Sequence, residues 1–366
     1  MKYKIRTIKL HSFKNFDELT YNVSSGKIFG RGNEGKTNLL SSIAALVMKA
    51  EPDGKSIAPL SDGTSAGWVS IEWDVDGYSS IKSYREWRRT DGGFLSSGEV
   101  PVFDRQEFFL IHNPLYIFQL SQADRNDILV DLVYKNKDAL LVDEISNDVY
   151  PWVREYAKRF GMADVVRLRR ELHMQQEKLV LAAKALEKIK HQLEVVSDPD
   201  MILNMEEARA QNEREVRECQ ELIDTILIIL DGLLSKAVEI LNSKMILTRF
   251  DAMGNLSYND MPLQRLSGSE LLECGLDIAN MVAGITKLNV PPTIIDNAAI
   301  YGKSDVDMDL YENLSQIITA SYADVDLCEY DKNCLVALDR SWKTKTSNEF
   351  RIDVQIEMLA TNIETK

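Results

Sequence analysis

The chain contains a glycine-rich segment, GRGNEGKT at residues 30–37, whose spacing is typical of a phosphate-binding loop. Gly30 and Gly35 let the backbone turn sharply, so that its N–H groups can face phosphate oxygens. Lys36 adds a positive charge beside those oxygens, and the Thr37 hydroxyl is a ligand for Mg²⁺. The segment therefore predicts a binding site for a nucleoside triphosphate with a magnesium ion.

The elements around this loop must hold it in place. A strand is expected over residues 21–29, entering the loop, and a helix over residues 37–49, leaving it. Leu40, Ile43 and Val47 recur at helical spacing and give this helix one apolar face. Strand, loop and helix thus follow one another in the order that phosphate binding requires.

A second pair of motifs lies in the last third of the chain. LSGSE at 266–270 precedes a helix expected over 270–285, and PPTIIDN at 291–297 is a short apolar strand that ends in Asp296. A carboxylate at the end of a buried strand beside a phosphate loop is well placed to bind Mg²⁺. Each motif is weak alone, but their order after a phosphate loop predicts the second half of a nucleotide site.

Between these motifs, residues 163–243 have the pattern of long paired helices. Apolar and small residues recur in steps of three and four, which is the 3.5-residue period of a coiled coil. SDPD at 197–200 interrupts the pattern, so we expect two helices that pair as an antiparallel hairpin. Because the second helix is apolar on more than one face near 226–234, an ordinary helical bundle remains the alternative.

The rest of the chain is expected to alternate between strands and helices. Strand-like stretches cover 67–76, 78–88 and 316–322, a helical stretch covers 121–134, and a hairpin is expected to turn at Gly254. This mixture of strands and helices around a phosphate loop predicts an α/β fold.

Composition and charge limit the function classes. The chain has 366 residues, 45% of them hydrophobic, which is enough for a sizeable core, and its net charge is −14. An acidic chain is not an obvious nucleic-acid binder, because neutralising phosphates supplies much of the affinity for DNA. Arg85, Arg88 and Arg89 around Trp87 form the candidate basic contact, with a solvated surface as the alternative.

The cysteines and histidines give no pattern of a metal site. The four cysteines form no CxxC pair, so free thiols in a reducing cytoplasm are expected, and the four histidines are scattered. The sequence shows neither a run of about 18 apolar residues nor an apolar leader, so we expect a cytoplasmic protein without a membrane segment.

The motifs together resemble a known family. FKNF at 13–16, GRGNEGKTN at 30–38, LSQADRNDILVDLV at 120–133, LSGSE at 266–270 and TIIDN at 293–297 are similar to motifs of the SMC/RecF/SbcC group of ABC-type ATPases, in particular its small phage-type members. The resemblance implies an ATPase head, in which a P-loop α/β sheet and an antiparallel β subdomain are interrupted by an antiparallel coiled-coil hairpin. It implies head halves at 1–160 and 246–366, with the hairpin at 161–245, in the host cytoplasm if the chain is phage-encoded.

The resemblance also implies a composite site between two copies, each ATP and its Mg²⁺ lying between the phosphate loop of one head and the LSGSE segment of the other. The implied ATP-binding residues are Gly30, Gly32, Asn33, Gly35, Lys36, Thr37, Asn38, Ser267, Gly268, Ser269 and Glu270. The implied catalytic residues are Lys36, Asp296 and Asn297. Thr37 and Asp296 would bind Mg²⁺, and either Gln106 or Asn113 would be the Q-loop ligand.

The sequence departs from the family in ways that concern hydrolysis. Asn297 stands where most members have a glutamate, and an asparagine can orient water but cannot accept its proton. No histidine occurs after His191, so the usual switch histidine is missing. Ser269 replaces a glycine, a change that a helix start should tolerate. Slow hydrolysis is expected, unless a carboxylate elsewhere substitutes.

The leading functional interpretation is a homodimer, closed by ATP, that acts on DNA in recombination or repair, with a nuclease or recombination mediator as partner. The alternative is an ATP-gated interaction module with little hydrolysis, which docks a protein through the hairpin tip near Ser197–Asp200. A kinase-like P-loop enzyme acting on a small molecule is the third interpretation, against which the LSGSE motif and the hairpin argue.

Overall fold

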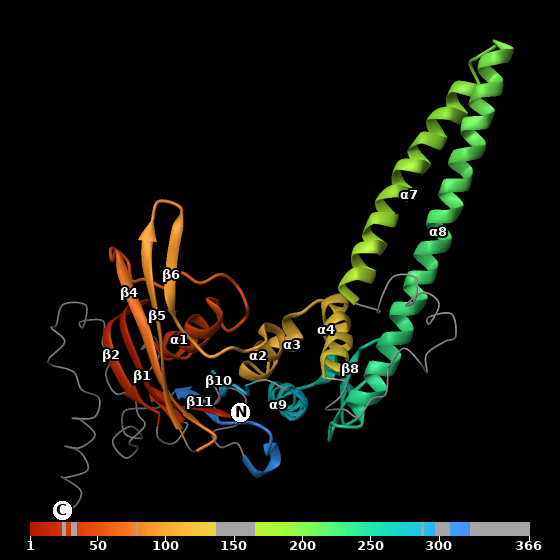
Figure 1. The fold of residues 1–366 in the computed structure, drawn as a ribbon. Coiled ribbons are helices and arrows are strands. Elements are labelled where there is room, and N and C mark those ends of the chain that lie inside the picture. Colours follow the sequence, from red (N-terminus) through yellow and green to blue (C-terminus); the bar gives the residue numbers. More distant parts are fainter. Residues whose placement is uncertain are drawn as a thin grey trace, which may run out of the picture. The chain divides into compact units, whose positions relative to one another are not determined.

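The computed structural model describes residues 1–23, 27–30, 35–77, 79–136, 165–286, 289–296 and 308–322 (Figure 1). The chain forms two compact units. The first consists of the described residues within 1–121, 244–249 and 256–366, and the second of those within 122–243 and 250–255. In the described part of the chain, no helix is long and apolar enough to cross a membrane.

A five-stranded antiparallel sheet makes up much of the first unit. Its strands, in the order β2-β1-β4-β5-β6, are β1 (Tyr3–Phe13), β2 (Phe16–Asn22), β4 (Ala66–Val75), β5 (Ser79–Thr90) and β6 (Gly93–Glu99). Alternate residues of β1 and β4 are buried, as expected for strands with one face against a core. The strands predicted at 67–76 and 78–88 are confirmed. Strand β6 has no counterpart among the predicted strands, because it is exposed along nearly all of its length and lacks apolar alternation.

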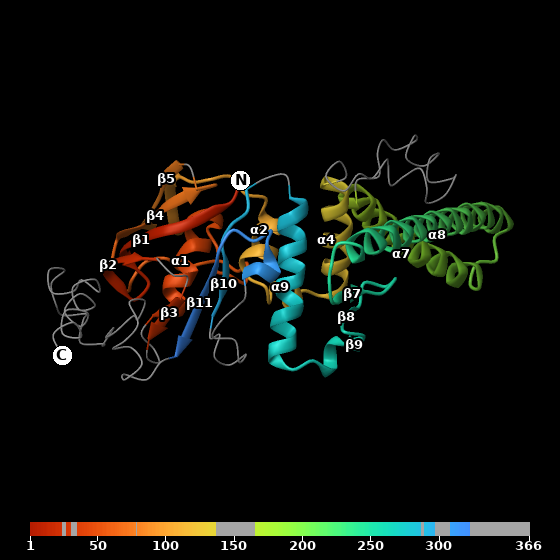
Figure 2. The same ribbon diagram turned by 90° about the horizontal axis from the view of Figure 1, so that it is seen from below.

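A small parallel sheet lies beside the phosphate loop. It contains β3 (Lys27–Gly30), β10 (Thr293–Ile295) and β11 (Ile317–Tyr322), with β11 between the other two (Figure 2). The single strand predicted at 21–29 is wrong, since β2 ends at Asn22 and a separate strand, β3, begins at Lys27. All three strands run in the same direction, so their carboxyl ends meet at one edge of the sheet.

The core of the first unit surrounds helix α1 (Lys36–Met48). Apolar side chains from α1, the antiparallel sheet and two strands of the parallel sheet form one buried cluster with Phe108 and Phe109. Helices α2 (Arg105–His112), α3 (Tyr116–Gln119) and α9 (Gly268–Ile285) complete this unit together with short elements. The short elements are β7 (Thr248–Phe250), β8 (Leu256–Tyr258), β9 (Met261–Pro262), η1 (Leu263–Arg265) and η3 (Met308–Tyr311).

The second unit contains the predicted helical hairpin. Helices α7 (Val165–Leu193) and α8 (Pro199–Asn242) pack along each other and are joined by a short turn (Figure 1). Asp198 ends the turn by capping α8, as its side chain accepts from the N–H of Asp200 at 3.0 Å. Leu172, Gln175 and Ala182, which follow the 3.5-residue period along α7, are buried. The antiparallel hairpin in the fold prediction is thus confirmed.

A third helix explains why α8 is apolar on two faces. Helix α4 (Gln122–Lys135) packs against both α7 and α8. Because α8 is longer than α7, α7 cannot cover all of it, and α4 supplies further contacts where Ile226 and Leu230 are buried. The hairpin is therefore a two-helix coil that becomes a small bundle where α4 joins it. Both interpretations of the sequence pattern hold, each for a different part of α8.

Candidate nucleotide-binding site

The start of helix α1 is shaped for an anion. Gly35 is its N-cap, with a left-handed φ of 88°, and it makes no side-chain cap hydrogen bond. The first turn of α1 carries no acidic residue. Because the first N–H groups of a helix have no intrahelical partner and lie at the positive end of its dipole, this terminus suits a phosphate group.

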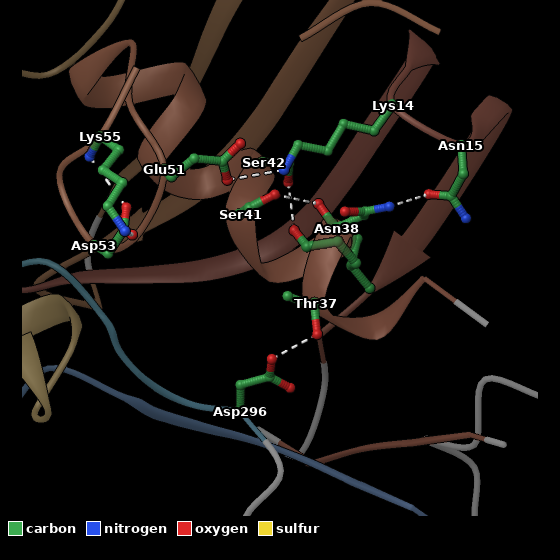
Figure 3. Close-up of polar contacts among 11 residues, drawn as sticks. Lys14, Asn15, Thr37, Asn38, Ser41, Ser42, Glu51, Asp53, Lys55 and Asp296 are labelled. Carbon is green, nitrogen blue, oxygen red and sulfur yellow. Dashed lines mark hydrogen bonds and ion pairs between the residues drawn. The ribbon is translucent and has the colours of Figure 1, made fainter. Parts of the chain in front are cut away.

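Close packing around Gly35 shows why a glycine is needed there. A Cβ at this position would lie 2.7 Å from Nδ2 of Asn15 and 2.8 Å from Cζ of Phe16, both in the turn that begins β2. Asn15 in turn accepts a hydrogen bond from the Asn38 side chain at 2.7 Å (Figure 3). The FKNF segment thus packs directly against the phosphate loop, which gives this part of the sequence motif a physical role.

The two halves of the predicted site meet at Thr37 and Asp296. The Thr37 hydroxyl donates to Oδ2 of Asp296 at 2.5 Å, across 259 positions of the chain (Figure 3). Thr37 follows the loop after β3 and Asp296 follows β10, so both come from the carboxyl ends of parallel strands. A hydroxyl and a carboxylate are the hard oxygen ligands that Mg²⁺ prefers.

A cavity of about 280 Å³ opens beside this pair. Its lining residues are Thr37, Leu40, Pro52, Asp53, Asn113, Pro114, Leu115, Leu272, Ile294, Ile295 and Asp296. Among the described residues, no group of three or more His, Cys, Asp or Glu side chains is arranged to hold a metal ion. Such a donor set fits Mg²⁺ held by one or two protein oxygens together with phosphate oxygens, rather than a metal held by the protein alone.

Lys36 lies at the start of α1 and is 7% exposed. An ammonium group this close to the phosphate loop adds the positive charge that a bound triphosphate requires. Gly30 is the last residue of β3. The predicted site residues Gly32, Asn33 and Asn297 lie outside the described residues.

Of the two Q-loop candidates, the structure places Asn113 at the cavity. The Asn113 side chain donates to the Pro52 carbonyl at 3.1 Å and accepts from the Leu115 N–H at 3.2 Å. Gln106 lies at the start of α2 and is not part of the cavity lining. Asn113 is thus the candidate that lines the cavity, with both ends of its amide bonded to backbone groups.

A buried histidine fixes the start of the strand that ends in Asp296. His112, the last residue of α2, contacts the Pro292 carbonyl through Nδ1 at 2.7 Å and stacks on Phe108. Complete burial lowers the pKa of His112 to about 4, although the hydrogen bond to Pro292 acts in the opposite direction. The imidazole is therefore neutral near pH 7 and donates Nδ1–H to the strand.

The LSGSE segment starts helix α9 with a complete capping box. Ser267 Oγ accepts from the Glu270 N–H at 3.4 Å, and the Glu270 carboxylate accepts from the Ser267 N–H at 2.7 Å. Further along α9, buried Asp277 accepts from three successive N–H groups at residues 246–248, at 2.8–3.2 Å. Gly268 and Ser269 lie in the first turn of α9, between the two residues of the capping box.

The arginine cluster predicted to contact DNA is divided between the two faces of β5. Arg85 is 5% exposed and donates to the Leu46 carbonyl of α1 at 2.5 Å, so its prediction as a DNA contact is wrong. Arg88 is exposed and paired with Glu86 at 2.8 Å, while Arg89 lies over the Phe94 ring. Alternation along a strand turns Arg85 and Arg88 to opposite faces, which the sequence SYREWRRT already implied.

Comparisons with known proteins add solved structures of similar fold. No family model matches the chain, and no curated protein matches it either. The SMC head domain of Pyrococcus furiosus, bound to the C-terminal domain of ScpA, is 15% identical with a TM-score of 0.41, over 89% of this chain and 91% of that one. RecF with ATP is 11% identical with a TM-score of 0.39, over 88% and 93%.

A third structure, the SMC head domain of Thermotoga maritima, is 12% identical with a TM-score of 0.31, over 87% of this chain and 89% of that one. The fold is similar to SMC head domains and RecF. These are groups whose motifs the sequence resembles.

Proposed function

We propose that the chain binds ATP with Mg²⁺ at the site formed by the phosphate loop, the start of α1 and Asp296, and that it works as an ATP-dependent dimer acting on DNA. The contact between Thr37 and Asp296 carries this proposal, because it joins the two motifs that the sequence keeps far apart. Bound Mg²⁺ would neutralise phosphate charge at this place.

Each residue of the site has a separate task in this proposal. The N–H groups at the start of α1 and Lys36 bind phosphate oxygens, while Thr37 and Asp296 hold the cation. The start of α9 would face the ATP of a second copy, and its capping box would open there so that the Ser267 hydroxyl, which now donates to Glu270 at 2.7 Å, donates to a phosphate oxygen. Two copies would therefore share two nucleotides, which makes ATP a condition of dimerisation.

Nucleotide binding is the direct test of this proposal. We expect the wild-type protein to bind a fluorescent ATP analogue more tightly with Mg²⁺ than with EDTA. Asp296→Asn should remove most of the Mg²⁺ effect, because the amide is a poor ligand, while metal-free binding persists. Asp62→Asn, in an exposed turn, is the matched control and should bind as the wild type does. Binding that ignores both Mg²⁺ and Asp296 would contradict the proposal.

The DNA part of the proposal rests on the motif resemblance, with Arg88 and Arg89 as the exposed basic residues of β5. If these side chains bind phosphates, affinity for duplex DNA should fall steeply with salt, and each contact should contribute about one unit to the slope. We expect Arg88→Ala with Arg89→Ala to flatten that slope in filter-binding titrations. An unchanged slope would remove these residues from the DNA surface.

A second candidate function is an ATP-gated module that docks a protein partner. Apolar side chains are exposed at the hairpin tip, with Val195 at 76%, Met201 at 50% and Leu203 at 60% exposure. Turnover does not discriminate between the two functions, since Asn297 predicts slow hydrolysis in both. Steady-state hydrolysis above about 10 s⁻¹, the median of enzymes in general, would contradict a slow switch of either kind.

A further inference from the structure

A second carboxylate lines the cavity beside Thr37 and Asp296, and neither the motifs nor the family resemblance points to it. Asp53 belongs to the turn that follows α1, at residues 51–55, and it is one of the residues that line the cavity. The acidic residue that usually follows the Asp296 position is replaced here by Asn297. The cavity thus contains a second carboxylate, that of Asp53, although the one expected directly after Asp296 is absent from the sequence.

The turn that carries Asp53 is held from several sides. The Asn113 side chain donates to the Pro52 carbonyl at 3.1 Å, and Arg105 donates to the Gly54 carbonyl at 3.1 Å. Its first residue, Glu51, is paired with Lys14 of the FKNF segment at 2.8 Å (Figure 3). Contacts from both ends of α2 and from the β1–β2 turn therefore fix the position of Asp53 before any ligand binds.

The Asp53 carboxylate is ionised and only partly engaged by the turn itself. Lys55 Nζ lies 2.7 Å from Oδ2, and the Lys55 N–H donates to Oδ1 at 3.1 Å. Partial burial acts to raise the pKa of Asp53, but these hydrogen bonds from Lys55 outweigh it and lower the pKa. The Lys55 side chain is 80% exposed, so its ammonium group can leave Asp53 and be hydrated by water instead.

We propose that Asp53 is a positioning residue of this site, whose carboxylate holds water in the cavity next to the Mg²⁺ that Thr37 and Asp296 bind. It supplies there a charged acceptor, whereas Asn297 offers only a neutral amide oxygen. Mg²⁺ retains several of its waters in proteins, and carboxylates next to a metal site orient those waters by accepting their hydrogens. This inference rests on the proposed function, because it presumes that the cation binds with a nucleotide.

Cation binding, measured apart from hydrolysis, tests the proposal. Mn²⁺ affinity would be measured by electron paramagnetic resonance on the full chain with a non-hydrolysable ATP analogue. We expect Asp53→Asn to weaken Mn²⁺ binding by about tenfold, the lower end for loss of a group that orients metal ligands. Asp53→Glu should recover part of the loss. The Asp62→Asn control also changes an Asp-Gly turn and should bind Mn²⁺ like the wild type.

Lys55→Gln separates this role from a purely structural one. If Asp53 only held the turn through Lys55, Lys55→Gln would weaken Mn²⁺ binding as Asp53→Asn does. If Asp53 faces the cation, removing the competing ammonium should leave the affinity unchanged or raise it. Equal losses in both variants would overturn the proposal, and so would Asp53→Asn binding within about twofold of the wild type.

The same titrations distinguish this inference from the proposed function. Binding of the analogue in EDTA reports on the phosphate loop alone, and we expect Asp53→Asn to match the wild type there. If the wild-type protein binds Mn²⁺ and the analogue and Asp53→Asn binds them equally well, the Asp53 proposal is wrong and the proposed function still stands. Wild-type protein that binds neither would overturn both.

Discussion

At the residue scale, the central observation is a hydrogen bond between two side chains that the sequence places 259 positions apart. The Thr37 hydroxyl and the Asp296 carboxylate meet at the carboxyl edge of a parallel sheet, where ligand sites of open α/β sheets lie. Neither residue would bind a cation well alone. Together, and next to Lys36, they provide the oxygen ligands and the positive charge that a magnesium–triphosphate complex requires.

His112 should make stability depend on pH in a defined range. The folded protein holds the imidazole neutral down to its pKa of about 4, whereas in the unfolded chain it takes up a proton near pH 6.5. Unfolding therefore binds a proton between these values, so the free energy of unfolding should fall as the pH falls from about 6.5 to 4, by about 3 kcal/mol in total. Above pH 6.5 this contribution is complete and constant.

Urea unfolding at several pH values measures this effect. In His112→Gln the loss of stability between pH 6.5 and 4 should be smaller than in the wild type, because the buried group no longer titrates. His173→Gln changes an exposed histidine of α7 and should keep the wild-type slope. Identical slopes for wild type and His112→Gln would show that burial of His112 does not set this dependence.

At the scale of elements, helix α1 connects the core to the phosphate site. Its apolar face is buried in the cluster that joins the two sheets, and its uncapped first turn points to the loop. Packing of α1 in the core thus keeps its start in place, although no side chain caps its first N–H groups. The opposite holds for α9, whose start is already satisfied by its own capping box.

Gly35 should be irreplaceable for contact reasons as well as for backbone reasons. Gly35 and Gly63 both have positive φ, at 88° and 79°, so an alanine at either costs about 1–2 kcal/mol of backbone strain. Only at Gly35 does the new methyl meet Asn15 and Phe16, while no described atom lies within 4 Å of a Cβ at Gly63. Gly35→Ala should therefore lower the free energy of unfolding by about 1–2 kcal/mol more than Gly63→Ala.

Thermal or urea unfolding of the two variants measures this difference, and a nucleotide titration accompanies it. Gly35→Ala should also lose ATP affinity, since relieving the contact moves the Asn15–Asn38 pair that packs on the loop. Gly63→Ala should bind as the wild type does. Equal stability losses, with nucleotide binding intact in both, would mean that the FKNF turn does not support the phosphate loop.

Sequence periodicity was a good guide where an element has one buried face. The spacing of apolar residues predicted α7 and α8 because each packs with a regular stripe against the rest of its unit. Helices α1 and α9 are buried on most sides, and their places directly after the GKT and LSGSE motifs identified them. It missed β6, which has no buried face, and it merged β2 with β3 although Asn22 and the SSG at 24–26 are residues typical of turns. Local patterns alone do not encode an exposed strand.

The site was only partly predictable, for a related reason. Thr37 and Asp296 belong to motifs with fixed spacing, so the sequence identified them. Asp53 and His112 reach the site through tertiary packing, and PDG or FLIH in the sequence indicates no more than a turn and a helix end. The three arginines do not form one cluster, because strand alternation places Arg88 on the face opposite to buried Arg85.

At the scale of the whole molecule, the chain combines the candidate nucleotide site with a helical hairpin that is inserted between two parts of the first unit. The hairpin leaves the first unit after Ser121 and the chain returns to it at Lys244, where Asp277 of α9 binds residues 246–248. The segment that follows the hairpin is thus hydrogen-bonded to α9, the helix that begins with LSGSE. In the proposed dimer, this helix would carry the nucleotide contact of each copy.

Ser267 is the residue at which stability and dimerisation can be separated. Asp caps helices about as well as Ser, but it cannot donate the hydrogen bond that Ser267 Oγ gives to Glu270, so Ser267→Asp should lower the free energy of unfolding by about 1 kcal/mol and leave the protein folded. It places a negative charge where the phosphate of the partner's nucleotide would approach, which should block the shared site. Nucleotide binding to each separate copy should persist, because the phosphate loop is unchanged.

The molar mass in solution, measured by light scattering with and without a magnesium–ATP analogue, tests the central claim most directly. We predict that the analogue converts the wild-type protein to a dimer, and that Ser267→Asp binds the analogue but does not dimerise in response to it. A wild-type protein that binds the analogue without any change in mass, or a Ser267→Asp protein that dimerises equally well, would contradict a nucleotide site shared between two copies.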